Sequence, residues 1–170
     1  MNPIMTVAEL FNQADLKLHG PVRWKVPIPR EDGGSSAGVY VVARVNEAAK
    51  DCEDCALQFK KPLPTGLGID HQYEQSRWLS KQPILYIGKT DRTIQKRLGE
   101  FYRHECGYAG PHNGGEIVKL LKCELSVYWS PATNPYYSEL TMICAFLKEA
   151  RQVPFANTDG RSDKRIQRTS

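Results

Sequence analysis

The segment Gly38–Val45 constrains the fold most, because its run of β-branched residues predicts a central strand of a sheet. A second short strand is predicted at 84–88, where the residues are continuously apolar or aromatic. A third is predicted at 125–129, where every second residue is apolar. Helical patterns lie between and around these strands, so the chain is expected to belong to the α/β class.

Three helices are predicted from their caps and their apolar spacing. The first begins at the N-cap Thr6 and ends before Gly20. The second covers about 93–105, and the third begins at a good N-cap, Asn134, and continues to about residue 151. The buried face of the third helix is expected to carry Leu140, Ile143, Cys144 and Leu147.

Length and composition indicate one globular domain with additions. The chain has 170 residues, and a domain usually takes roughly 100–200. No apolar run approaches the ~20 residues that a membrane span needs. The N-terminus has no basic region followed by an apolar one, so we expect no secretory signal. With an odd number of cysteines, five, we expect reduced thiols and a cytoplasmic protein.

The charge is unevenly placed along the chain. The net charge is +4, from 23 basic and 19 acidic residues, and the whole excess lies in the second half. Such a distribution is compatible with a polyanionic partner such as nucleic acid. A solvated helix face and a charged tail explain it about as well.

Two tripeptides resemble the signatures of the GIY-YIG nucleases: Gly-Val-Tyr at 38–40 and Tyr-Ile-Gly at 86–88. The second continues into Lys89 and is followed by Arg97, a pattern similar to that of excision-repair nucleases and GIY-YIG restriction enzymes. Each tripeptide is common, but their order and spacing are much more specific. The resemblance covers about residues 36–158.

Two further residues extend the resemblance. Glu139 stands early in the third predicted helix, where the family places its lone metal-binding glutamate. Asn157 follows a proline near the end of the matched region, as a family asparagine does. The resemblance implies a small, mainly antiparallel three-stranded sheet flanked by helices, and a DNA endonuclease that uses one Mg²⁺ or Mn²⁺ ion.

The chemistry of phosphodiester cleavage suits these residue types. Two adjacent strands can present Tyr40 and Tyr86 on one face, but a phenol with a pKa near ~10 is a poor base without a cation or a metal-bound water. Lys89, just past the second strand, is the expected cation. The planar guanidinium of Arg97 suits contact with two phosphate oxygens. Glu139 is an oxygen ligand of the kind that Mg²⁺ takes together with waters and phosphate oxygens.

Each of these residues also has an ordinary structural interpretation. A buried tyrosine on a strand is usually a core residue, an isolated arginine lies at the surface, and a glutamate near a helix N-terminus is favoured by the helix dipole. Their joint occurrence at the family spacing favours the functional interpretation.

Two candidate sites depart from the family pattern. Some GIY-YIG restriction enzymes have a histidine four residues after the helix arginine, where this chain has Phe101. His104, seven residues after Arg97, is the alternative phosphate contact, or an exposed residue. Cys52 and Cys55 have the spacing of half a zinc site, but no second pair follows, so a structural zinc ion is not expected.

The chain is therefore divided into three parts. Residues 1–35 form an N-terminal helix and an extended arm, and 36–158 form the nuclease domain with a long insertion at about 46–83. Residues 159–170 form a basic, flexible tail. The residues predicted to contact double-stranded DNA are Lys60, Lys61, Arg92, Lys96, Arg103, Lys164 and Arg165.

The sequence favours a self-contained endonuclease of the restriction type, which could act as a homodimer. A repair or recombination nuclease that recognises DNA structure is an alternative. A nucleic-acid-binding module without catalytic turnover is a second alternative. The retention of both tyrosines and Glu139 argues against it.

Overall fold

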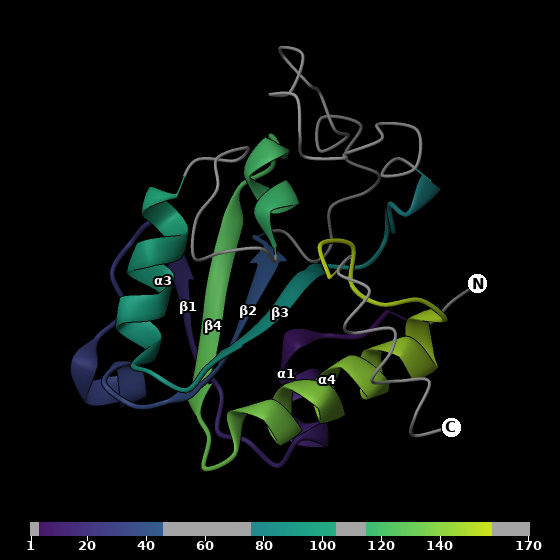
Figure 1. Cartoon of the computed structure of the whole chain (residues 1–170). Helices are drawn as coiled ribbons and strands as arrows, with labels where there is room; N and C mark the ends of the chain where they lie inside the picture. Colours follow the sequence, from purple (N-terminus) through teal and green to yellow (C-terminus); the bar gives the residue numbers. More distant parts are fainter. Residues whose placement is uncertain (1–3, 46–75, 105–114, 158–170) are drawn as a thin grey trace.

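The computed structural model describes residues 4–45, 76–104 and 115–157. They form an α+β fold in which one antiparallel sheet is flanked by helices (Figure 1). The four strands are β1 (His19–Arg23), β2 (Gly38–Arg44), β3 (Ile84–Thr90) and β4 (Leu125–Pro131). Their order across the sheet is β1-β4-β2-β3, so β2 is central as expected and β3 lies at an edge.

The sheet has one strand more than the three that we predicted. The additional strand, β1, comes from the segment expected to be an extended arm, and it pairs antiparallel with β4. Its residues show no alternating apolar pattern and include Gly20 and Pro21, so the sequence did not predict a strand there. An edge position tolerates this composition, because a proline there has no ladder hydrogen bond to donate.

The described helices are α1 (Val7–Gln13), α3 (Ile94–Arg103) and α4 (Pro135–Ala150), with short helical turns η1 (Arg30–Gly34) and η3 (Glu116–Leu120). The predicted capping box is present: Thr6 Oγ1 accepts from the Glu9 N–H at 3.2 Å, and the Glu9 carboxylate accepts from the Thr6 N–H at 2.8 Å. Helix α1 ends earlier than predicted, and the chain turns at Asp15, which has φ 53°. In the described ranges, no helix is both long and apolar enough to cross a membrane.

The helices cover both faces of the sheet (Figure 1). One face packs with α3 and η3, through a core that includes Tyr40, Phe101 and Val118. The other face packs with α1 and α4, through a core that includes Val41 and Ile143. Because side chains alternate along a strand, neighbouring residues of β2 belong to different cores, and Tyr40 belongs to the α3 side.

The buried face of α4 differs from the predicted one. Leu140, Cys144 and Leu147 are only half-buried, and of the predicted stripe Ile143 alone is fully inside. The face that packs inward also carries Glu139, which is 7% exposed. An apolar pattern cannot include a glutamate, so sequence analysis placed the stripe one position too far around the helix. The consequence is that the candidate metal ligand is buried.

Candidate active site

Two tyrosines from neighbouring strands lie together on the α3 side of the sheet. Tyr40 on β2 is opposite Gly88 on β3, and Tyr86 stands two residues before that glycine. The two rings have centroids 6.0 Å apart with a 56° angle between their planes. Phe101 of α3 packs against both, at 6.4 Å from Tyr40 and 5.8 Å from Tyr86. The structure thus brings the tyrosines of the two signatures onto one face.

Two glycines make room for these rings. A Cβ atom on Gly88 would lie 2.5 Å from Cζ of Tyr40, so the ring occupies the space above this glycine. A Cβ on Gly115 would lie 2.8 Å from Cε1 of Tyr86, and Gly115 also has a φ of 74°, which favours glycine. Any larger residue at either position would displace a tyrosine. This gives a steric reason for the glycine in Tyr-Ile-Gly.

The environment of the two phenols raises the pKa of both. Burial raises the pKa of Tyr40, while the positive charge of Arg97 opposes that rise. Burial raises the pKa of Tyr86 well above its ordinary value, and the charges of Tyr40 and Glu139 raise it further. Within the described residues the Tyr40 hydroxyl has no hydrogen bond of normal geometry, although Arg97 and Tyr86 lie close enough to lower its pKa. Burial is thus the main cause of the raised pKa of both phenols, and the charge of Arg97 opposes the rise at each.

Arg97 and Glu139 reach this pair from two different helices. Arg97 is half-buried on α3, and its charge acts on both phenols. Glu139 is buried on α4, on the other side of the sheet, yet its charge raises the pKa of both phenols. Among the described strands β3 is at the edge, so no further strand separates the two helical layers there. One cation and one carboxylate from two helices thus act on the phenols of two neighbouring strands.

Lys89 is not beside the tyrosines. It lies within β3 and not past it, opposite Val39, so its side chain points to the α4 side of the sheet, away from Tyr40. Its Nζ is 3.5 Å from Oδ2 of Asp91 and 5.9 Å from the centroid of the Tyr136 ring. Arg97, and not Lys89, is the cation whose charge acts on the phenols.

Asn157 holds the backbone of β3. Its Oδ1 accepts from the Ile87 N–H at 2.9 Å, and its Nδ2 donates to the Ile87 carbonyl at 2.8 Å. The preceding Ala156 N–H donates to the Leu85 carbonyl at 2.8 Å. Asn157 therefore covers the strand edge directly beside Tyr86 and holds the backbone there.

His104 belongs to a small ionic group at the end of α3. Its Nδ1 lies 3.1 Å from Oε2 of Glu116, and Lys119 Nζ lies 3.2 Å from the same oxygen. Lys119 also donates to the His104 carbonyl and lies 4.9 Å from the centroid of the Phe101 ring. The His104 side chain is only 11% exposed, so the expectation of an exposed histidine is wrong.

Three of the seven predicted DNA contacts lie in the part of the chain that the structure describes. Arg92 forms a bidentate pair with Glu100, at 2.8 and 2.5 Å, whereas Lys96 and Arg103 are exposed on α3. Four predicted contacts and the two cysteines of the half zinc site lie outside the described residues: Lys60, Lys61, Lys164, Arg165, Cys52 and Cys55. Across the described ranges, no three His, Cys, Asp or Glu residues are grouped as a metal site.

Sequence analysis missed two neighbours of the tyrosines. Burial and the charge of Tyr40 raise the pKa of Tyr102, which places a third phenol close to the pair. Gly115 supports the Tyr86 ring, but in the sequence it belongs to a glycine-rich stretch that indicated only turns. Neither residue is part of a motif, and only the packing of α3 and η3 on the sheet identifies them.

Comparison of the chain with protein-family models, with curated proteins and with solved structures finds no match in any of the three.

Proposed function

We propose that this chain is a metal-dependent endonuclease that hydrolyses phosphodiester bonds of DNA. The observation that carries the proposal is the meeting of Tyr40, Tyr86, Arg97 and Glu139, whose charges influence the two phenols from four separate elements. Such a group contains a proton acceptor, a phosphate-binding cation and an oxygen ligand. These are the functions that phosphodiester cleavage needs.

Each side chain has a distinct role in this proposal. Arg97 binds two oxygens of the scissile phosphate through its planar guanidinium. Tyr40, the tyrosine of the first signature, accepts in its ionised form the proton of the attacking water, or attacks the phosphorus itself. Tyr86 keeps its proton, because burial raises its pKa, and supports Tyr40 with its hydroxyl. Asn157 keeps β3 and hence Tyr86 in place.

Glu139 is the residue that would hold the metal. Its carboxylate is buried, and no cluster of three ligands accompanies it in the described ranges. One carboxylate completed by water and phosphate oxygens suits Mg²⁺ or Mn²⁺, whereas a structural zinc site needs four protein ligands. When bound, such an ion would stabilise negative charge at the phosphate.

The test is cleavage of DNA by the purified chain. Supercoiled plasmid and labelled duplexes are incubated with Mg²⁺, with Mn²⁺ or with EDTA, and the ends of the products are mapped. The chain should cut only with metal. Glu139→Ala should abolish cleavage while DNA binding, measured by fluorescence anisotropy in EDTA, is kept.

A matched control comes from the same helix. Glu149→Ala, at the far end of α4, should cut like the wild type. Two results would overturn the proposal: no cleavage of any DNA with either metal, or a Glu139→Ala variant that cuts at the wild-type rate. Ends that map to one sequence would favour a restriction-type enzyme.

A further inference from the structure

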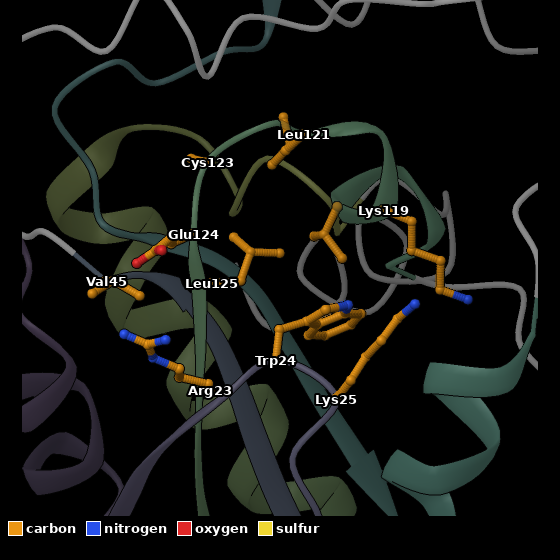
Figure 2. Close-up of a pocket in the computed structure, with 10 residues that line it drawn as sticks. Arg23, Trp24, Lys25, Val45, Lys119, Leu121, Cys123, Glu124 and Leu125 are labelled. Carbon is orange, nitrogen blue, oxygen red and sulfur yellow. The ribbon is translucent and has the colours of Figure 1, made fainter.

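A pocket opens beside the end of β1 (Figure 2), and none of the four groups of the candidate site lines it. Its volume is about 430 Å³, within the range of small-ligand sites, roughly 300–1,000 Å³. Trp24 and Leu125 lie centrally in it, and Leu121 adds apolar surface. We call it the Trp24 pocket; its principal lining residues are Arg23, Trp24, Lys25, Lys119, Leu121 and Leu125.

The Trp24 pocket is positively charged. Three cations line it, Arg23, Lys25 and Lys119, against one carboxylate, Glu124. Lys119 is also paired with Glu116, so Arg23 and Lys25 supply the excess positive charge. In Figure 2, Lys25 and Lys119 point to the side of the pocket toward which the indole nitrogen of Trp24 is turned. Neither Arg23 nor Lys25 forms an ion pair with another residue in the described part of the chain. The pocket therefore suits a ligand that is both flat and anionic.

A tight turn places Lys25 at the pocket. The Val26 N–H donates to the Arg23 carbonyl at 3.0 Å, and Lys25 is the third residue of this turn, with a φ of 71°. In Figure 2 its side chain extends along Trp24 into the pocket. The ammonium group is therefore available to a ligand that lies against Trp24.

Only one aromatic ring separates the Trp24 pocket from the tyrosine pair. The Trp24 ring lies edge-on to Phe101, with centroids 5.2 Å apart, and Phe101 lies 5.8 Å from Tyr86. The rings of Trp24 and Tyr86 are therefore within about 11 Å of each other. Along one DNA strand the rise is about 3.4 Å per nucleotide, so the straight-line separation, across the buried Phe101 ring, is at most that of about three nucleotides.

We propose that the Trp24 pocket binds one unpaired nucleotide of the DNA substrate, close to the scissile bond. The base lies against Trp24 and the leucines, and its phosphate faces Lys25. This inference rests on the proposed nuclease function for the identity of the substrate. A paired base cannot enter such a pocket, so the site would select an extrahelical or single-stranded nucleotide.

The first experiment follows tryptophan indole N–H signals by NMR while thymidine 5′-monophosphate is added to the full chain. The three tryptophans are distinguishable reporters, because Trp129 donates to the Asp32 carbonyl at 2.8 Å and Trp78 packs against Phe155. The Trp24 signal should shift and the other two should not. Thymidine alone and inorganic phosphate alone should each produce a much smaller shift.

Variants test the charge contribution. Lys25→Gln should weaken the nucleotide affinity about fivefold, the effect of one charge pair in contact at the surface. Lys17→Gln, an exposed lysine elsewhere, is the matched control and should leave the affinity unchanged. An unmoved Trp24 signal, or an equal shift with inorganic phosphate alone, would overturn the proposal.

A second measurement separates this inference from the nuclease function. Binding to a duplex with one unpaired thymidine is compared with binding to the fully paired duplex, in EDTA, by fluorescence anisotropy. The wild type should prefer the unpaired substrate, and Lys25→Gln should lose most of that preference. Equal affinity for both duplexes refutes the pocket assignment even if the chain cuts DNA, whereas a preference without cleavage refutes only the nuclease function.

Discussion

Replacing Asn157 by alanine should destabilise the fold through the backbone of β3. The side chain of Asn157 makes two hydrogen bonds to Ile87, which is fully buried. Alanine would leave the N–H and the carbonyl of Ile87 without these partners. Each buried backbone group left unsatisfied costs about 1–3 kcal/mol, so with two such groups the free energy of unfolding should fall by about 2–6 kcal/mol. For a chain of this size, the melting temperature should fall by about 4 °C or more.

The assay is urea unfolding followed by circular dichroism, with thermal melting alongside. Asn12→Ala, an exposed asparagine in α1, is the control and should change the free energy of unfolding by less than about 0.5 kcal/mol. If Asn157→Ala unfolds at the same urea concentration as the wild type, the two hydrogen bonds do not hold the strand. In that case a direct role of Asn157 in the reaction would return as the explanation for its presence.

A second substitution at this position removes the hydrogen-bond donor and keeps the acceptor. Asn157→Asp keeps an acceptor for the Ile87 N–H, but an ionised carboxylate would face the Ile87 carbonyl. Only the protonated acid can donate there, so the folded-state pKa of the new aspartate should lie above its unfolded value of about 3.9. The folded variant then binds more protons than the unfolded one between these two pKa values. Its stability relative to the wild type should fall as pH rises through that window and be recovered at lower pH.

Three further predictions concern the tyrosine pair. Tyr40→Phe should lose about 10²–10⁴-fold in single-turnover cleavage rate with an unchanged melting curve, and Tyr86→Phe should lose less; the opposite order would reverse their roles. Arg97→Lys should lose most of the rate because an ammonium cannot bind two oxygens in the manner of a guanidinium, so full activity of this variant would show that charge alone matters. Gly88→Ala should lower the free energy of unfolding by about 1–3 kcal/mol and displace the ring of Tyr40, since its Cβ would lie 2.5 Å from Cζ; wild-type stability would contradict the close packing described.

The local elements were largely predictable from the sequence. The β-branched run of β2, the N-caps Thr6 and Asn134, and the helix predicted to begin at about residue 93 all lie where local patterns placed them. These features depend on residues close together in the chain, so composition and spacing suffice to find them. Tyr40 and Tyr86 could also be placed on one face, because neighbouring strands with an alternating pattern leave few arrangements.

The partners of the candidate site residues were decided by the tertiary structure. Lys89 points away from the phenols because of the β2–β3 register, in which Val39 lies opposite Lys89 and Gly88 opposite Tyr40. Asn157 bonds to a residue 70 positions earlier in the chain, and no local pattern encodes such a contact.

Local residue patterns therefore predicted the strand and helix segments and the residue types available for chemistry. The packing of distant segments decides the rest: Glu139 turns inward on α4, β1 joins the edge of the sheet, and Trp24 lies one ring away from Tyr86. The physical reason is that backbone propensity is a local property, whereas burial and charge coupling depend on how distant segments pack against one sheet.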